Sequence, residues 1–342
     1  AFNVTTGSGS DTSDKEIVFS GANPFISTSS DQVTLNGGEV DIANGTLTIN
    51  TNRNNGANTG GNITIAKTVY GNSDESLVLD AHSAGTGTIS LGPVGASTSQ
   101  IAGITATAEG GITLNGNIIT SDAGTGITFN DNVIIADNTS ITITTNSGNT
   151  DGGVTFGGSI SGVGGTDATN ATSENLTIDS GTGNVSIASV GVSANTALNN
   201  LTINSGTGDA GSATDMDGDI TISGNIGASS SGSVTVEGVT GTLTLGNAET
   251  ETLTLGGTVY NTNTATYTSK SGGNNTKLTG QDPVFTASDA AITFAGGNVL
   301  IDTSGAASSP STLTVTNSGS GITFAAINGT DGDIISLNAG TD

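Results

Sequence analysis

Apolar and polar residues alternate in short runs along the whole chain, and these runs predict β-strands. The commonest run is a triplet in which Thr or Ser stands between two apolar residues, as in Ile63-Thr64-Ile65 and Leu201-Thr202-Ile203. In an extended strand this alternation places both apolar side chains on one face and Thr on the other. No stretch of helical length repeats its apolar residues every 3.6 positions. We therefore expect an all-β fold.

The triplets often come in pairs separated by Gly-rich corners, which indicates a repeating unit. Leu176-Thr177-Ile178 is followed by a turn and then by Val185-Ser186-Ile187, and Leu313-Thr314-Val315 leads in the same way to Ile322-Thr323-Phe324. The Gly, Asn, Asp and Ser residues between them are typical of turns. Units of roughly 20 to 30 residues have the size of one coil of a solenoid.

A parallel β-solenoid is the fold that these short strands favour. Each strand carries only two or three apolar side chains, so one coil cannot bury enough surface alone, whereas stacked coils share a continuous core. We predict that residues 1–342 form one elongated parallel β-helix. The alternative is one or more β-sandwiches, because short strands joined by turns describe that fold too.

Two segments depart from the simple repeat. Residues 256–283 are poor in triplets and contain two lysines, so we expect them to protrude as a loop, with Tyr260, Tyr267 and the neighbouring Phe285 available for a lateral or end contact. Residues 335–341 resemble the opening of a further unit. We expect the chain to be a segment of a longer protein, or to pair at this end with another subunit, because bare strand edges aggregate.

Composition excludes several classes of protein. The 342 residues include 54 Gly and no Cys, and the net charge is −25. Ile, Val, Leu and Phe make up roughly a fifth of the chain, near the level of disordered proteins, but their ordering into strands argues against disorder. No Lys or Arg occurs between Lys67 and Lys270, so the chain is unsuited to bind nucleic acid. The sequence contains no run of about 18 apolar residues, so it predicts no transmembrane helix.

Residues suited to catalysis are sparse. His82 is the sole imidazole and stands in a corner between strands, where we expect a surface loop residue. The acidic residues mostly fall singly in turns, and the chain has no Trp to line a sugar-binding cleft. We therefore expect a protein that is not an enzyme, with a polysaccharide-acting β-helix enzyme as the alternative.

One acidic segment is a candidate metal site. Asp215, Asp217 and Asp219 stand at alternate positions, and clustered carboxylates are the hard ligands that Ca²⁺ prefers. The segment is not an EF-hand, because Gly218 is its fourth residue rather than its sixth and Ile226 stands where the twelfth-position Glu is required. The alternative is a solvated acidic turn, and we expect no other cofactor.

Outward threonines suggest a further alternative function. The segments 312–316 and 262–266 carry Thr at every second residue, and flat arrays of this kind on a solenoid can match ice. An ice-binding solenoid is therefore a second alternative. The preference of Thr for strands explains the same residues without any ligand.

Three segments carry a resemblance to a known group of proteins. In residues 176–191, 198–203 and 267–280 the chain resembles the β-strand repeats of filamentous-haemagglutinin-like adhesins and autotransporter passengers of Gram-negative bacteria. The resemblance implies a parallel β-helix exported to the cell surface. It implies a structural, extracellular protein: a filament or matrix building block or an adhesin shaft.

The resemblance also implies partners. They are other copies of the chain in filaments, the cell surface itself, and a carbohydrate or host-surface ligand. The chain departs from the pattern in its irregular coil lengths around residues 210–219 and 256–283. We recognise no translocating barrel and no export domain in these residues, and we expect such parts to lie outside this segment.

Overall fold

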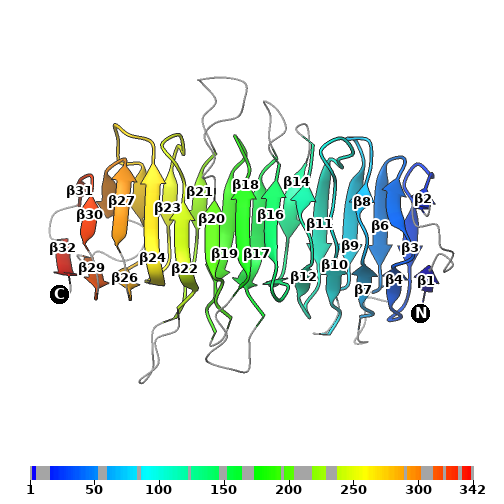
Figure 1. The fold of residues 1–342 in the computed structure, drawn as a ribbon, viewed down its shortest axis with the longest axis horizontal. Helices are drawn as coiled ribbons and strands as arrows, with labels where there is room; N and C mark the ends of the chain where they lie inside the picture. Colours follow the sequence, from blue (N-terminus) through cyan, green and yellow to red (C-terminus); the bar gives the residue numbers. More distant parts are fainter. Residues whose placement is uncertain are drawn as a thin grey trace.

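The computed structural model describes residues 2–4, 16–52, 60–82, 86–121, 125–145, 152–163, 173–193, 196–203, 218–228, 237–288, 291–301, 311–318, 321–329 and 333–339. In this part of the chain every regular element is a β-strand. The strands stand side by side along an elongated body, with the N-terminus at one end and the C-terminus at the other (Figure 1). The predicted all-β fold is confirmed.

Equivalent strands of successive coils form three stacks, which we call A, B and C. Stack A contains β1 (Phe2–Val4), β4 (Val33–Leu35), β7 (Ile63–Ile65), β10 (Ile89–Leu91), β12 (Ile112–Leu114), β15 (Val133–Ile135), the ends of β17 (Val154–Ser161) and β19 (Val185–Val190), the start of β24 (Val259–Ser269), β26 (Val284–Ala287), β29 (Thr312–Asn317) and β32 (Ile334–Ala339). Stack B contains β2 (Glu16–Phe19), β5 (Glu39–Ile42), β8 (Val69–Tyr70), β13 (Ile118–Ile119), β16 (Ser140–Thr144), β18 (Asn175–Asp179), β20 (Asn200–Ile203), β22 (Val239–Leu245), the end of β24, β27 (Ile292–Gly296) and β30 (Ile322–Phe324). Stack C contains β3 (Phe25–Ser27), β6 (Thr46–Asn50), β9 (Ser76–Asp80), β11 (Gly103–Thr107), β14 (Gly126–Phe129), the starts of β17 and β19, β21 (Ile220–Ile222), β23 (Leu253–Leu255), β25 (Thr276–Leu278), β28 (Val299–Ile301) and β31 (Ile327–Asn328).

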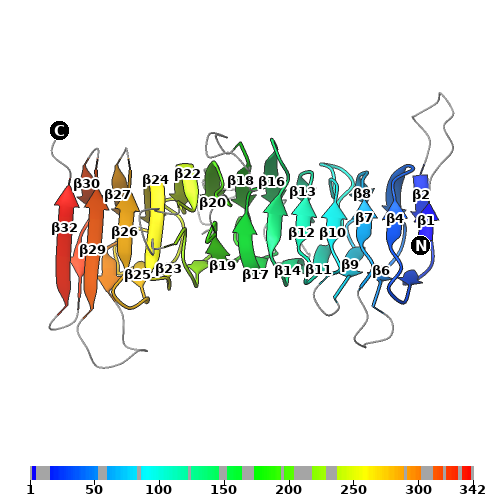
Figure 2. The ribbon, with the colours of Figure 1, turned by 90° about the horizontal axis from the view of Figure 1, so that it is seen from below.

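The strand pairing within each stack is parallel and identifies the fold as a β-solenoid. The chain visits stacks A, B and C in turn and then returns to A one strand further along, so each strand pairs with its equivalents in the coils before and after it. The rotated view shows the strands running across the long axis and stacked one after another along it (Figure 2). A β-sandwich would require antiparallel sheets packed face to face. The sandwich alternative is therefore wrong.

The core is a continuous row of inward side chains that repeat from coil to coil. Ile63, Ile89, Ile112 and Val133 occupy one inward position in four successive coils, and each is fully buried. Because like residues stand about 4.8 Å apart along a parallel stack, aliphatic side chains pack directly on their counterparts. The apolar members of the triplets therefore form the core, as predicted.

The prediction of a protruding loop at residues 256–283 is wrong. This segment contains β24 and β25, and β24 pairs in register with β22, β26 and β27. Tyr260 and Tyr267 are buried in the core rather than available for contacts, and Phe285 is fully buried beside them. The triplet pattern missed this segment because its inward positions hold Tyr, Ala and Ser instead of Ile, Leu and Val.

Aromatic rings replace aliphatic side chains in this part of the core. Tyr267 and Phe294 stack with ring centroids 4.7 Å apart, and Phe294 stacks on Phe324 at the same distance. Tyr260 stacks on Phe285 at 4.4 Å, and its buried hydroxyl accepts a hydrogen bond from the Gly257 N–H at 2.7 Å. That bond satisfies the polar end of a ring that is otherwise enclosed by apolar groups.

Asparagine side chains link one coil to the next at the corners. In each case a side-chain oxygen, of Asn in seven pairs and of Asp in one, accepts a hydrogen bond 2.8 to 3.1 Å long from a backbone N–H one coil later. The donor stands at the equivalent position, except Thr258, which comes one residue before it. The pairs are Asn23 with Thr46, Asn62 with Thr88, Asn117 with Thr142, Asn132 with Ser159, Asn184 with Asp219, Asn200 with Thr242, Asn225 with Thr258, and Asp282 with Thr312. We call these bonds the corner links. They extend the strand ladder past the strand ends, where backbone N–H groups would otherwise lack a partner.

Candidate functional surfaces

The candidate calcium ligands fall largely outside the described residues. Asp215 and Asp217 lie there, and only Asp219 is described. Asp219 is exposed at the corner before β21, where its N–H donates to Asn184 Oδ1 and its carbonyl accepts from the Val185 N–H, both at 2.9 Å. The backbone of Asp219 thus joins two coils. The calcium site remains a prediction.

His82 lies on the surface at the corner after β9. Its Nε2 is 3.3 Å from Glu109 Oε1, with about half of the His82 side chain exposed (53 %). Its backbone N–H donates to Asp80 Oδ1 at 3.0 Å. An exposed pair of this kind contributes at most about 1 kcal/mol to stability. The described contacts of His82 are those of a corner residue.

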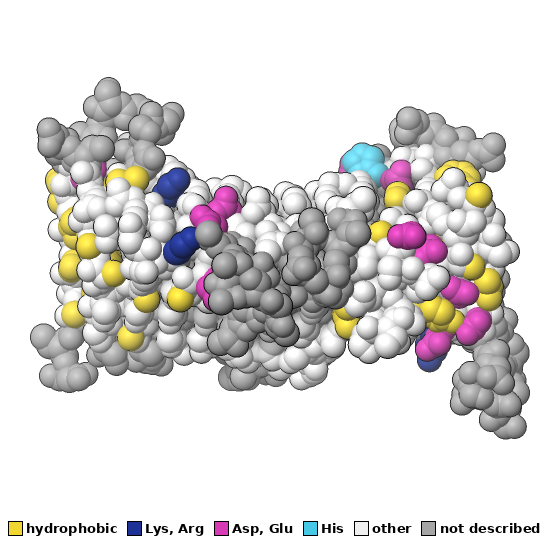
Figure 3. Space-filling view, turned by 90° about the horizontal axis from the view of Figure 1, so that it is seen from above, with side chains coloured by type: hydrophobic (Ala, Val, Ile, Leu, Met, Phe, Trp, Pro, Cys, Tyr) yellow, Lys and Arg dark blue, Asp and Glu magenta, His cyan; other side chains and the backbone are white. Residues whose placement is uncertain are grey.

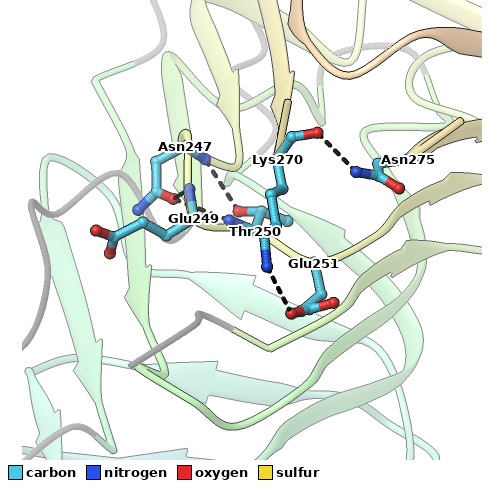
Figure 4. Close-up of polar contacts among 6 residues, drawn as sticks. All are labelled: Asn247, Glu249, Thr250, Glu251, Lys270 and Asn275. Carbon is cyan, nitrogen blue, oxygen red and sulfur yellow. Dashed lines mark hydrogen bonds and ion pairs between the residues drawn. The ribbon is translucent and has the colours of Figure 1, made fainter. Parts of the chain in front are cut away.

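Around Lys270, polar side chains bind to other side chains and to the backbone of the same chain (Figure 4). Lys270 Nζ is 3.3 Å from Glu251 Oε1, and the Lys270 carbonyl accepts from Asn275 Nδ2 at 2.7 Å. On the preceding coil the buried Thr250 accepts the Asn247 N–H at its hydroxyl, 3.0 Å away. This lysine is therefore engaged by a carboxylate of the same chain.

Acidic side chains gather on the outer face of stack B near its N-terminal end. Glu16 of β2 stands in register with Glu39 of β5, and Asp41 stands in register with Tyr70 of β8. Burial raises the pKa of Asp41, and the nearby Glu16 and Glu75 raise it further. Burial also raises the pKa of Tyr70, which shares a hydrogen bond with Glu16. The in-register carboxylates repel one another, so this face carries concentrated negative charge.

The outer face of stack B changes completely from β16 onward. One outward position is Thr in seven successive coils, and we call this set the threonine column. Its members are Thr142, Thr177, Thr202, Thr244, Thr266, Thr293 and Thr323. Stack C carries a second hydroxyl column of Thr105, Thr128, Thr155, Ser186, Thr221 and Thr254, which ends at Lys277.

The sequence predicted that the threonines of the triplets face outward and that stacked coils align like residues, but not which residues share each column. The triplets that contain these residues were recognised, but their alignment depends on the register between coils, and the corners that separate them differ in length. The segments 312–316 and 262–266, in which Thr recurs along a strand, do not form a two-column array that continues from coil to coil: Thr314 stands in register with Val284. The feature of the sequence that points to the columns is the central Thr of each triplet, because these residues align between coils rather than along one strand.

Apolar side chains are exposed toward both ends of the described solenoid. Figure 3 shows hydrophobic side chains near the two ends of one face and mostly polar groups between them. On β32, Ile335 and Leu337 are 45 % and 52 % exposed although they stand in register with the buried Leu313 and Val315. No described strand pairs with the other edge of β32. Such an edge is suited to a further parallel strand.

The described residues contain no group of three or more His, Asp or Glu side chains placed to hold a metal ion. Among the described residues there is also no helix long and apolar enough to cross a membrane. Comparison with protein-family models, with curated proteins and with solved structures finds no match for this chain.

Proposed function

We propose that this chain is a structural protein of the bacterial cell surface or extracellular matrix, a rigid rod that serves as a filament or matrix building block or as an adhesin shaft. One observation carries the proposal: parallel strand pairing links successive coils from β1 to β32, and one buried core runs through them from Val33 to Val315. A solenoid of this kind resists bending because each coil is hydrogen-bonded to both neighbours. The location rests on the resemblance to exported adhesin repeats.

The use of polar groups supports a structural role over catalysis. The corner links, the Lys270–Glu251 pair and the His82–Glu109 pair all join parts of the chain to each other. The acidic cluster of Glu16, Glu39 and Asp41 lies on strands of one flat face. A glycosidase needs two carboxylates that flank a sugar in a cleft. The enzyme alternative therefore has less support than the rod.

Electron microscopy of the purified chain and of native material tests the proposal. We expect unbranched rods of uniform width, because every coil adds to one axis. Compact globular particles would contradict the proposal. Release of reducing sugar from extracellular polysaccharides would favour the enzyme alternative instead.

A pair of variants separates a filament subunit from a single-chain shaft. Ile335→Lys with Leu337→Lys places charges on the inward side of β32, whereas the control Ser336→Lys changes the opposite side of the same strand. If copies join through this edge, sedimentation velocity will show assemblies that the double variant loses and the control keeps. A shaft predicts monomers in all three proteins at every concentration.

A further inference from the structure

The threonine column is more uniform than strand preference requires. An outward position of stack A runs through Thr34, Thr64, Ser90, Thr113 and Ile134 in successive coils, so these strands accept varied residues. The threonine column instead holds the same residue seven times. Strand preference favours Thr, Val, Ile and Tyr alike and explains Thr at any one position. It does not explain one residue type at all seven.

Hydrogen bonds fix the residues that flank the column. The neighbouring outward position holds Ser140, Asn175, Asn200, Thr242 and Thr264 in successive coils. Asn175 Nδ2 donates to Ser140 Oγ at 2.9 Å, and Asn200 Nδ2 donates to Asn175 Oδ1 at 2.7 Å. Thr side chains are themselves restricted at χ1. The surface is therefore rigid before any ligand arrives.

The column is also uncharged in a chain of net charge −25. Among the residues of β16, β18, β20, β22, β24, β27 and β30, Asp179 alone is charged. The aromatic residues of these strands lie at core positions and not on the outer face: Tyr267, Phe294 and Phe324 stack on one another, and Tyr260 stacks on Phe285. Apart from Asp179, the strands of this face therefore offer no charge to bind an ion, and none of their aromatic rings lies outward to stack on a sugar.

From these features we infer that the threonine column is a binding surface for ice. Each Thr offers one methyl group and one hydroxyl that both donates and accepts a hydrogen bond. Parallel strands set the hydroxyls about 4.8 Å apart, so the column spans roughly 29 Å. A rigid, neutral and periodic row of hydroxyls orders water into a repeating layer at little further cost in entropy. An ice lattice is the ligand that needs periodic hydrogen bonding and no charge. This inference does not depend on the proposed role as a rod.

Ice-affinity uptake tests the inference with a control in the same coils. The test variant Thr202→Lys with Thr244→Lys changes two neighbours in the column. The control Thr221→Lys with Thr254→Lys changes two neighbouring, half-buried threonines of stack C, whose strands follow β20 and β22 directly in the chain. Purified full chain is grown slowly into a polycrystalline ice shell, and the protein in the ice and in the liquid is measured. Circular dichroism confirms that each variant is folded.

The expected result is uptake of the wild type and of the control, with the test variant reduced to the level of a protein that does not bind ice. Exclusion of the folded wild type from ice would overturn the inference. Equal loss in the control would also overturn it, because the binding surface would then not be the threonine column. If the wild type is excluded from ice but binds an insoluble neutral polysaccharide, and the test variant loses that binding, the column is a carbohydrate surface and the ice inference is wrong.

Discussion

Stack B carries two different surfaces on one scaffold. At β2 and β5 its outward positions hold Glu16, Glu39 and Asp41 beside Val18, whereas from β16 to β30 one outward position holds only Thr. The inward positions of both regions are mostly apolar, as at Ile42 and Ile178, which are fully buried. The comparison teaches that inward residues determine the coil while outward residues are free to set the chemistry of the face.

The largest expected effect comes from substitution of a buried inward residue, which both regions contain. Ile42→Ala and Ile178→Ala should each lower the free energy of unfolding by about 2–5 kcal/mol, because both leave a cavity in the core. Denaturant unfolding followed by circular dichroism measures this change. The control is Thr177→Ala, beside Ile178 on the outer face, which should change stability by about 0.5 kcal/mol or less. A cost for Thr177→Ala equal to that of Ile178→Ala would contradict the division into inward and outward positions.

A smaller effect is expected from the corner links that accompany the threonine region. Asn200→Ala removes the acceptor for the Thr242 N–H and should cost about 1 kcal/mol. The exposed Asn44 makes no corner link, so Asn44→Ala should cost about 0.5 kcal/mol or less. Thermal melts of the two variants compare them directly. Equal stability of the two would mean that the links add nothing beyond the strand ladder.

The smallest expected effect is a pH dependence of stability in the acidic region that the threonine region should not show. The pKa of Asp41 is raised in the folded chain by burial and by Glu16 and Glu75, so the folded state takes up a proton more readily than the unfolded state. Stability of β2 and β5 should therefore rise as pH falls through this raised pKa, until the unfolded value of about 3.9 is passed. Asp41→Asn should remove this dependence and stabilise the region at pH 7, by about 1 kcal/mol or less.

Hydrogen exchange measured strand by strand tests the pH effect. In the wild type, amides of β2 and β5 should gain protection between pH 7 and pH 4, after correction for the intrinsic exchange rate, relative to those of β16 to β20. In Asp41→Asn this difference should disappear. A pH response in β16 to β20 as large as that in β2 and β5 would show that general charge reduction, and not Asp41, is responsible.

Alternation was sufficient to predict the strands and most core residues, because a period of two needs only local sequence. It failed at residues 256–283, where Ala265, Tyr267 and Ser269 take the inward positions and no aliphatic triplet marks the strand. The corner links, and the set of threonines that share one column, could not be predicted for another reason. Both depend on which residues face each other across coils, and corners of unequal length conceal that register. The calcium site at Asp215, Asp217 and Asp219 is still a prediction.

Each corner link joins one coil only to the coil that follows it. The number of coils, and with it the length of the molecule, can therefore change. Asn175 and Asn200 are equivalent residues 25 positions apart. A tandem duplication of residues 175–199 would therefore supply a further coil that contains Asn184, the acceptor of a corner link to the coil that follows. Each such event would lengthen the body by about 4.8 Å without altering any existing contact type. Recombination between repeats can thus adjust reach in steps of one strand spacing.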